Sequence, residues 1–256
     1  MKADSPQNPR DTELSGRNGP PPRVNVKQGY QHLPSTSRLA VNGDPGSQSD
    51  SRGAVFLDRD GVLVEDVHFL KEPGQIQLLP GVPGALRSLQ DLFCIIVVTN
   101  QSGIARGLFT EDNLLAIHTD LVNRLSAQGA LVDDIYYCPH LPEASIAKYR
   151  VDCGCRKPRP GMLLRAGSDW GIDLTRSFLV GDRPRDVEAA RAAGVSGIIV
   201  GESNSDREPS VAACQDLAQA ADLILETVTS PDHHSALESN SGARKRPIHS
   251  VEEGLN

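Results

Sequence analysis

The chain has 256 residues, a formal net charge of -7 and a hydrophobic content of 38%, a composition typical of a globular protein with an ordinary core. No apolar run approaches the ~20 residues that a membrane-spanning helix needs, and the first residues lack the apolar segment of a secretory signal. We therefore expect a cytoplasmic protein with no membrane partner. The acidic balance also argues against a nucleic-acid partner.

Both ends of the chain are predicted to be disordered. Residues 1–52 are rich in Pro, Gly, Ser, Asn and Gln and show no sustained apolar period, so they cannot bury enough surface to offset the entropy of ordering. The tail 228–256 has the same character. Its neighbouring His233 and His234 could bind a metal, but solvated tail residues are the favoured interpretation. Residues 53–227 then form one folded domain.

Short β-branched runs alternate with helical patterns throughout this domain. Near-continuous apolar runs of this kind are typical of parallel strands that are covered on both faces. The alternation of strands and helices predicts an α/β fold with a doubly wound, mostly parallel sheet. The predicted strands are residues 54–58, 94–99, 135–138, 178–182, 197–200 and 222–225.

Two helices have clear local signals. One is predicted to begin after Thr110 as its N-cap. The other is expected to start near Pro184 and to stop near Gly194. The apolar stripe of the first helix consists of Leu114, Ile117, Leu121 and Leu125.

The five cysteines are an odd number in a compartment expected to be reducing, which argues against a disulfide framework. Cys94 lies in a predicted strand, and Cys214 lies in the helical-looking segment "SVAACQDLAQ". We interpret both as small buried hydrophobic residues.

Four potential soft metal ligands occur close together in the segment 138–155. Three thiolates and an imidazole suit a closed, tetrahedral zinc site that leaves no position open for chemistry. Unrelated buried cysteines, or a redox pair of Cys153 and Cys155, are the alternatives. A structural zinc would fix the loop that delivers Arg156 and Lys157. The predicted ligands are Cys138, His140, Cys153 and Cys155.

Polar residues follow three of the predicted strands. Asp58 and Asp60 end the first, Thr99 ends the second and Asp182 ends the one at 178–182. An ordinary turn is the alternative reading of "FLDRDG", because Asp and Gly are common turn residues. Open α/β sheets bind their ligands at the carboxyl ends of strands, so these groups and Lys157 are expected to converge at one edge.

Such a set of groups suits phosphoryl transfer, which requires positioning and neutralisation of charge. Asp58 and Asp182 can hold Mg²⁺, which prefers oxygen ligands. A metal-bound carboxylate can attack phosphorus, and Asp60 can protonate the leaving alcohol and later accept a proton from water.

The motifs "FLDRDG", "TNQSG", "CRKPRPG" and "GDRPRD" resemble, in order, the four motifs of the haloacid dehalogenase superfamily. The resemblance implies that Asp58 is the nucleophile, Asp60 the general acid/base, and Thr99 and Lys157 the phosphoryl stabilisers. It also implies that Asp182 and the backbone carbonyl of Asp60 complete the magnesium ligands. Asp186 would support these ligands without binding the ion directly.

Further likeness points to one branch, which contains the D-glycero-D-manno-heptose 1,7-bisphosphate 7-phosphatases and the histidinol-phosphatases. "TNQSGIARG", "YYCPH" and "CRKPRPGML" resemble the heptose enzymes, whereas "GDR" at 181–183 is closer to the histidinol-phosphatases. The resemblance implies removal of the 7-phosphate of the heptose bisphosphate, a step toward nucleotide-activated heptose for surface polysaccharide. Histidinol phosphate is the alternative substrate.

The segment between Asp58 and Thr99 is too short for a large cap domain, so small loops must shape the pocket. Ordinary solvated loop is the alternative interpretation of Asp66 and His68, and a core position that of Phe69. By likeness, the substrate-contact candidates are Asp66 to Phe69, Asn100, Gln101, Ser102, Gly103, Arg106, Arg156 and Arg183.

We expect a monomer whose partner is a small phosphorylated metabolite, a sugar bisphosphate. Two other classes remain open: a zinc-clipped binding or scaffold protein without catalysis, and a nucleic-acid 3′-phosphatase.

Overall fold

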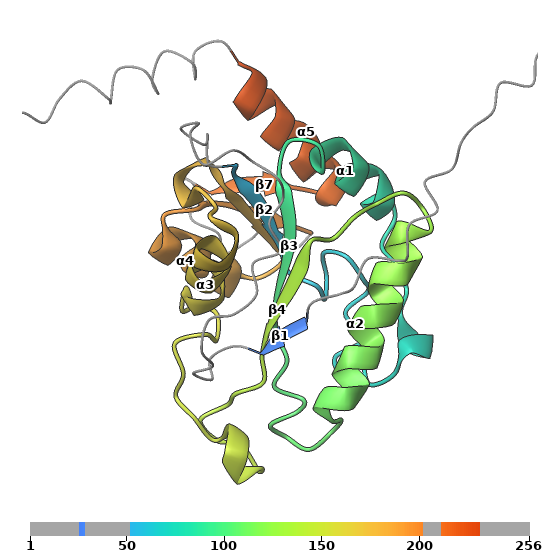
Figure 1. Cartoon of the computed structure of the whole chain (residues 1–256), viewed down its shortest axis with the longest axis vertical. Helices are drawn as coiled ribbons and strands as arrows, with labels where there is room; N and C mark the ends of the chain where they lie inside the picture. Colours follow the sequence, from blue (N-terminus) through green and yellow to red (C-terminus); the bar gives the residue numbers. More distant parts are fainter. Residues whose placement is uncertain (1–25, 29–51, 202–210, 231–256) are drawn as a thin grey trace, which may run out of the picture.

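The computed structural model describes residues 26–28, 52–201 and 211–230, and the strands among them form one seven-stranded sheet (Figure 1). All the strand pairs are parallel, and the strand order is β1-β4-β3-β2-β5-β6-β7. The predicted doubly wound α/β fold is confirmed. The strands are β1 Val26–Gln28, β2 Ala54–Leu57, β3 Cys94–Asn100, β4 Asp134–Cys138, β5 Phe178–Gly181, β6 Ser196–Val200 and β7 Ala212–Cys214.

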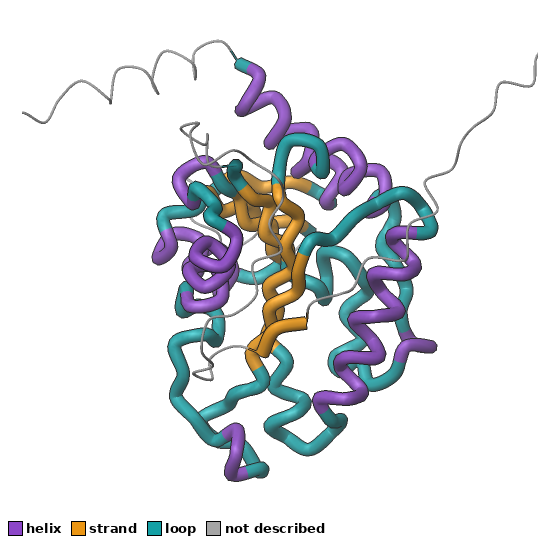
Figure 2. The backbone as a smooth tube through the Cα atoms, viewed as in Figure 1, coloured by secondary structure: helices purple, strands orange, loops and turns teal. Residues whose placement is uncertain are grey.

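Helices cover both faces of the sheet (Figure 2). Side chains alternate along each strand, so Val55 and Leu57 face the layer of α1, α2 and α5, while Ala54 and Phe56 face α3 and α4. All four are fully buried, which explains why β2 reads as a continuous apolar run. The helices are α1 Val82–Leu89, α2 Glu111–Ser126, α3 Gly161–Trp170, α4 Pro184–Ala193 and α5 Leu217–Thr229.

The chain order reverses at the centre of the sheet. Strand β2 pairs with β3 on one side and with β5 on the other, so the chain builds outward from β2 in both directions. The loops that follow these strands therefore diverge and leave a crevice at their carboxyl ends, where ligands bind in open α/β sheets.

The two helices with clear local signals form where the sequence predicts them. The Thr110 side chain accepts a hydrogen bond from the Asn113 backbone N–H and caps α2. Helix α4 begins at Pro184, and Gly194 ends it in the left-handed conformation with φ 73°. Both ends follow the expected chemistry of helix caps.

Two assignments near the end of the domain are wrong. Residues 222–225, predicted as a strand, lie inside helix α5. Cys214, predicted on a helix, is the last residue of β7, which pairs with β6. A short apolar run fits a buried helix as well as a strand, and pairing at a sheet edge overrides the helix propensity of alanines.

The prediction for the ends of the chain is tested only in small part. Val26–Gln28 form β1 beside β4, so this piece of the predicted disordered extension is part of the sheet. Val228 and Thr229, from the predicted disordered tail, belong to helix α5. Apart from Arg52 and Ser230, the other residues of the two predicted segments, with His233 and His234, lie outside the described residues.

The connection from β2 to β3 contains only α1 and the single 3₁₀ turn Pro73–Gln75, so no large cap domain covers the crevice. None of the helices in the described ranges has the length and apolar character needed to cross a membrane.

Candidate active site

Asp58 occupies the first position after the central strand. Its backbone N–H donates to the Val180 carbonyl at 3.0 Å, which extends the pairing with β5 and fixes the residue. The side chain is only 3% exposed. One carboxylate oxygen accepts from the Arg59 N–H at 2.7 Å, and the other lies 3.1 Å from the Lys157 ammonium.

Lys157 is a fully buried cation between two carboxylates. Its Nζ lies 2.7 Å from Asp186 and donates to the Val98 carbonyl at 2.7 Å, in addition to its contact with Asp58. Burial by itself would lower the pKa of Lys157, but the charges of Asp186 and Asp58 outweigh it and hold the pKa above its ordinary value. The side chain is therefore an ammonium.

Asn100, at the end of β3, holds the backbone of Lys157. Its amide donates to the Lys157 carbonyl at 3.0 Å and accepts from the Lys157 N–H at 3.1 Å. This reciprocal pair joins the loop after Cys155 to the central sheet, so the lysine enters the site from a fixed position.

Asp58, Asp182 and Asp186 form an acidic cluster whose ligand atoms lie within 4.8 Å of one another. Burial, followed by the charge of Asp58, raises the pKa of Asp182 to about 6. One Asp182 oxygen is buried and has no hydrogen-bond partner in the described residues, while the other lies 2.9 Å from Arg183. Hard oxygen donors with unsatisfied negative charge fit a magnesium ion.

Two glycines leave room for this cluster. Gly61 has φ 82°, and a Cβ at this position would lie 2.5 Å from an Asp182 carboxylate oxygen. A Cβ on Gly181 would overlap the Asp186 side chain. Because the backbone passes so close to both carboxylates, neither position can carry a side chain without displacing one of them.

Asp60 lies at the edge of the same site. Gln101 donates through its amide to Asp60 at 3.0 Å and to the Thr99 hydroxyl at 2.9 Å. The buried Arg59 guanidinium donates to both oxygens of Asp60. The Asp60 side chain remains 26% exposed, so a part of the carboxylate faces the crevice.

A hollow of about 370 Å³ lies above these groups. Most of the predicted substrate-contact residues line it, whereas Arg106 is exposed and is not part of its lining. Phe69 lines the hollow and also packs against a small apolar cluster below it. The predicted residues in the lining are Asp58, Asp60, Asp66, His68, Phe69, Thr99, Asn100, Gln101, Ser102, Gly103, Arg156 and Arg183.

Arginines and carboxylates both line the hollow. Arg156, Arg183 and Arg185 all line it, and Arg183 lies 3.2 Å from the Asp66 carboxylate. A site of this kind attracts an anionic ligand. Asp66 and His68 are exposed loop residues in the lining.

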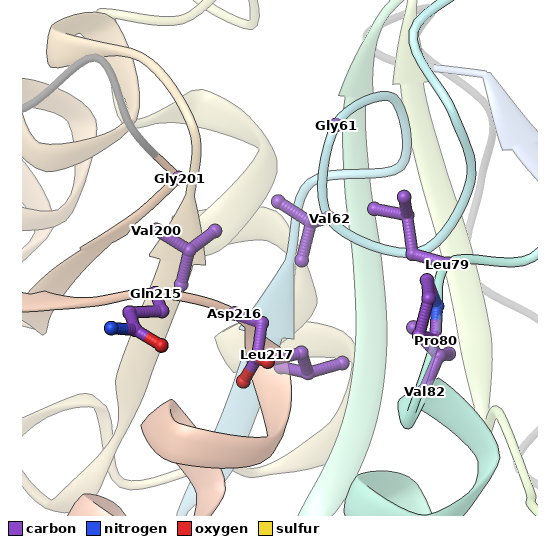
Figure 3. Close-up of a pocket in the computed structure, with 10 residues that line it drawn as sticks. All are labelled: Gly61, Val62, Leu79, Pro80, Val82, Val200, Gly201, Gln215, Asp216 and Leu217. Carbon is purple, nitrogen blue, oxygen red and sulfur yellow. The ribbon is translucent and has the colours of Figure 1, made fainter.

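A second hollow of about 320 Å³ lies between the start of α1, the start of α5 and the loop after β2 (Figure 3). Its lining is largely apolar, with Val62, Leu79 and Leu217 among its side chains. Asp216 is the carboxylate there, and it accepts from the Gln219 N–H as the cap of α5. This hollow therefore lacks the cations and free carboxylates that phosphoryl transfer needs.

The four predicted zinc ligands meet beyond the end of β4. Cys138 and Cys155 are buried, and their ligand atoms, with those of His140 and Cys153, lie within 4.8 Å of one another. Neighbouring sulfurs are 3.2 to 3.5 Å apart, and the His140 Nδ1 lies 3.4 Å from the Cys155 sulfur. Sulfurs about 2.3 Å from a tetrahedral zinc are about 3.8 Å apart, which is close to this arrangement.

The three thiols shift one another's pKa values. The contact with Cys153, together with burial, raises the pKa of Cys138 to about 12. The neighbouring thiols raise the pKa of Cys155 and lower that of Cys153. All five cysteines are free. Three thiols at this spacing cannot all be ionised without a cation between them, so zinc fits the site.

The loop that carries these ligands is tied to the rest of the domain. Tyr149 packs in an apolar cluster with Tyr137 and Leu141, and its hydroxyl donates to Glu111 at the start of α2. At the other end, the Gly161 N–H donates to the Gly154 carbonyl at 3.0 Å. The cysteines and the residues that follow them therefore have a defined position against α3.

Three residues of the site were not predicted from the sequence. Arg185 lines the hollow, Arg59 binds Asp60, and the buried His118 contacts Arg59. Arg59 and Arg185 lie inside the recognised motifs, which was the available signal. His118 interrupts the apolar stripe of α2, and a polar residue at a core position was its only sequence signal.

Comparisons with known proteins identify relatives of this chain. Residues 154–230 match the HAD-hydrolase-like family model. The D-glycero-beta-D-manno-heptose-1,7-bisphosphate 7-phosphatase of Rhodopseudomonas palustris is 45% identical over 147 residues, which cover 57% of this chain and 82% of that protein. The enzyme of the same name from Escherichia coli K12 is 39% identical over 176 residues, or 68% of this chain and 89% of its own length.

A solved structure shows the same fold. The D,D-heptose 1,7-bisphosphate phosphatase of B. bronchiseptica, complexed with magnesium and phosphate, superposes with a TM-score of 0.61 and 36% identity. The match covers 68% of this chain and 99% of that one. The chain therefore belongs to the haloacid-dehalogenase-like family that contains the D-glycero-beta-D-manno-heptose-1,7-bisphosphate 7-phosphatases, and it is a phosphomonoester hydrolase.

Proposed function

We propose that the protein removes the 7-phosphate of D-glycero-D-manno-heptose 1,7-bisphosphate, with Mg²⁺ as cofactor and a phosphoryl group carried transiently on Asp58. The observation that carries the proposal is the Asp58 carboxylate, placed after the central strand beside the Lys157 ammonium and beneath a hollow with an arginine-rich rim. The names of the relatives support the choice of sugar and the β anomer.

The reaction has two steps on the residues of this chain. A carboxylate oxygen of Asp58 forms a bond to phosphorus as the bond to the sugar oxygen breaks, and Asp60 gives its proton to that oxygen. A water molecule then attacks the phosphorus, and Asp60 takes a proton from it. The bond between Asp58 and phosphorus breaks, which restores the Asp58 carboxylate and releases inorganic phosphate. Lys157 and Thr99 stabilise charge on the phosphoryl oxygens.

Asp58, Asp182 and the backbone carbonyl of Asp60 are the proposed magnesium ligands. When bound there, the ion would supply positive charge opposite the phosphoryl oxygens. Two observations support a cation there: one buried oxygen of Asp182 has no partner among the described residues, and the pKa of that residue is raised. Asp186 is held behind the site by Lys157.

The arginines around the hollow suit a substrate with a second phosphate. Arg156, Arg183 and Arg185 can bind phosphate oxygens through their forked guanidinium groups. Histidinol phosphate carries one phosphate and a positively charged amine, which these arginines would repel. The same charges support a sugar bisphosphate over the histidinol alternative, despite the "GDR" at 181–183.

We also propose that the cluster of Cys138, His140, Cys153 and Cys155 holds a structural zinc. With four protein ligands the ion has no open position, so its role is to order the loop. Arg156 and Lys157 follow Cys155 directly, so the zinc fixes the segment that delivers these two cations to the site.

The test is a substrate panel with the purified protein, with and without Mg²⁺. The panel contains both anomers of the heptose bisphosphate, histidinol phosphate, a 3′-phosphorylated oligonucleotide and p-nitrophenyl phosphate. We expect Mg²⁺-dependent phosphate release with the highest kcat/KM for the β-heptose bisphosphate. A preference for histidinol phosphate or the oligonucleotide would replace the proposed substrate. No release from any compound would favour a binding or scaffold role.

Two aspartate variants provide the controls for this panel. Asp58→Asn removes the nucleophile with almost no change of shape and should lower kcat by at least about a thousandfold. Asp112→Asn makes the same chemical change at an exposed position on α2, away from the site, and should leave kcat unchanged.

A further inference from the structure

His118 is a buried polar residue on the face of α2 that packs against the sheet. Its neighbours on that face, Leu114, Ile117 and Leu121, are fully buried, and the imidazole itself is 0% exposed. Burial, followed by the nearby charge of Arg59, lowers the pKa of His118 well below its ordinary value. The ring is therefore neutral, and one of its nitrogens must act as an acceptor.

The contact with Arg59 determines which nitrogen accepts. The Arg59 Nη1 lies 3.2 Å from the His118 Nε2. An arginine can only donate, so Nε2 accepts and the proton resides on Nδ1. The Nδ1 is buried and has no hydrogen-bond partner within the described part of the chain. An unpaired buried donor is costly, and its presence in a folded protein requires an explanation.

Arg59 uses its opposite edge to hold Asp60. Its Nε and Nη2 donate to one Asp60 oxygen at 3.0 and 2.9 Å, and Nη2 donates to the other at 2.8 Å. The guanidinium is 1% exposed. It thus bridges a buried imidazole and the Asp60 carboxylate, which lines the hollow.

We propose that His118 and Arg59 are positioning residues that orient the carboxyl group of Asp60 toward the leaving oxygen of the substrate. This inference rests on the proposed function, in which Asp60 is the general acid and base. His118 binds Nη1 and so fixes the plane of the guanidinium. The guanidinium in turn fixes the rotation of the carboxyl group, and Gln101 restrains it from the other side.

A comparison of two leaving groups tests this role. An alkoxide leaving group needs the proton of Asp60, whereas p-nitrophenol is acidic enough to leave without it. His118→Leu removes the acceptor for Arg59 and leaves the volume nearly unchanged. We expect its single-turnover rate of leaving-group release from an alkyl phosphate, the step in which Asp60 acts as the acid, to fall roughly tenfold or more, with KM nearly unchanged. The rate of p-nitrophenol release in the same step should fall less than about threefold.

His118→Gln provides the conservative rescue, because its amide oxygen can accept from Arg59. This variant should recover most of the rate on the alkyl phosphate. Leu115→Ala, on the exposed side of the same helix, should match the wild type on both substrates. If His118→Leu does not fold, Arg59→Lys replaces it, because a lysine keeps the charge but loses the fork, and the same selective loss is expected.

Equal losses on the two substrates, or no loss on either, would overturn the inference. A second measurement is independent of turnover: ¹⁵N NMR of the His118 ring in the wild type should show a neutral ring with the proton on Nδ1. A proton on Nε2 would likewise overturn it. Mg²⁺-dependent release of p-nitrophenol by the wild type tests the proposed function separately, because this leaving group does not need the proton of Asp60.

Discussion

The Lys157 ammonium lies 3.1 Å from the Asp58 carboxylate and 2.7 Å from that of Asp186, and all three side chains are buried. The lysine thus has two roles, one structural and one in the proposed reaction. It compensates two carboxylates that would otherwise repel each other, and it provides a fixed positive charge where the phosphoryl group is proposed to bind. Both roles depend on the short contacts of Lys157 with Asp58 and Asp186, so the stability of the domain and its activity are coupled at this residue.

Lys157→Met tests this coupling. Loss of the cation leaves Asp58 and Asp186 as uncompensated buried charges, which should lower the free energy of unfolding by about 3–5 kcal/mol and abolish phosphate release. Urea unfolding and steady-state kinetics measure the two effects. Lys148→Met is the matched control: Lys148 pairs with Glu111 at the surface, and its loss should change neither quantity. Full stability of Lys157→Met would contradict the role given to the buried charge.

Gly61→Ala tests the magnesium site through a steric contact. The added Cβ would lie 2.5 Å from the Asp182 carboxylate and should displace it. We expect the Mg²⁺ concentration for half-maximal activity to rise about tenfold or more. Gly171→Ala has a similar left-handed backbone, with φ 65°, but no atom within 4 Å of the new Cβ. Gly171→Ala should lower the free energy of unfolding by about 1–2 kcal/mol, the cost of the left-handed conformation for alanine, and should not change the magnesium dependence.

Cys153→Ser tests the zinc clip. Because a serine hydroxyl binds zinc poorly, we expect the zinc content of the purified protein to fall from stoichiometric to a small fraction, measured by elemental analysis. The melting temperature and kcat should fall together as the loop with Arg156 and Lys157 loses its anchor. Cys94→Ser, on strand β3 away from the cluster, should retain zinc. Unchanged zinc in Cys153→Ser would exclude this ligand set.

The pH dependence of stability should carry a contribution from His118. Its folded pKa is depressed, so its contribution is fully present above the unfolded pKa of about 6.5 and is lost as pH falls below that value toward the lower folded pKa. The unfolding free energy should decrease by up to about 1.4 kcal/mol per pH unit in that window from this group. His118→Gln should have the shallower slope; parallel slopes would mean that folding does not depress the pKa of His118.

The sequence predicts the central part of the fold well because its signals there are local. Strands β2, β3 and β5 are buried on both faces along most of their length, and so is the end of β6, so each contains a continuous apolar run. The carboxyl ends of parallel strands lie at the same edge of a sheet, so the approximate position of Asp58 and Asp182 follows from topology. No ion or substrate is needed to predict that convergence.

The sequence-based predictions fail where tertiary contacts determine the secondary structure or the direction of a side chain. Val26–Gln28 have a weak local signal and form β1 only by pairing with β4. Leu223, Ile224 and Leu225 form a short apolar run without a period, and the packing of α5 on α1 and the sheet makes them helical. At the site, Arg106 lies in a recognised motif, yet the turn in which its N–H donates to the Ser102 carbonyl leaves the side chain exposed outside the pocket lining. Side-chain direction in loops is not encoded in a local pattern.

The most direct test of the account is to trap the covalent intermediate. Enzyme mixed with excess substrate and Mg²⁺ is quenched in acid within the first turnover, digested, and analysed by mass spectrometry. The account predicts a phosphoryl group on the peptide that contains Asp58, and its absence from Asp58→Asn. A phosphoryl group on another side chain, or turnover by Asp58→Asn at the wild-type rate, would contradict it.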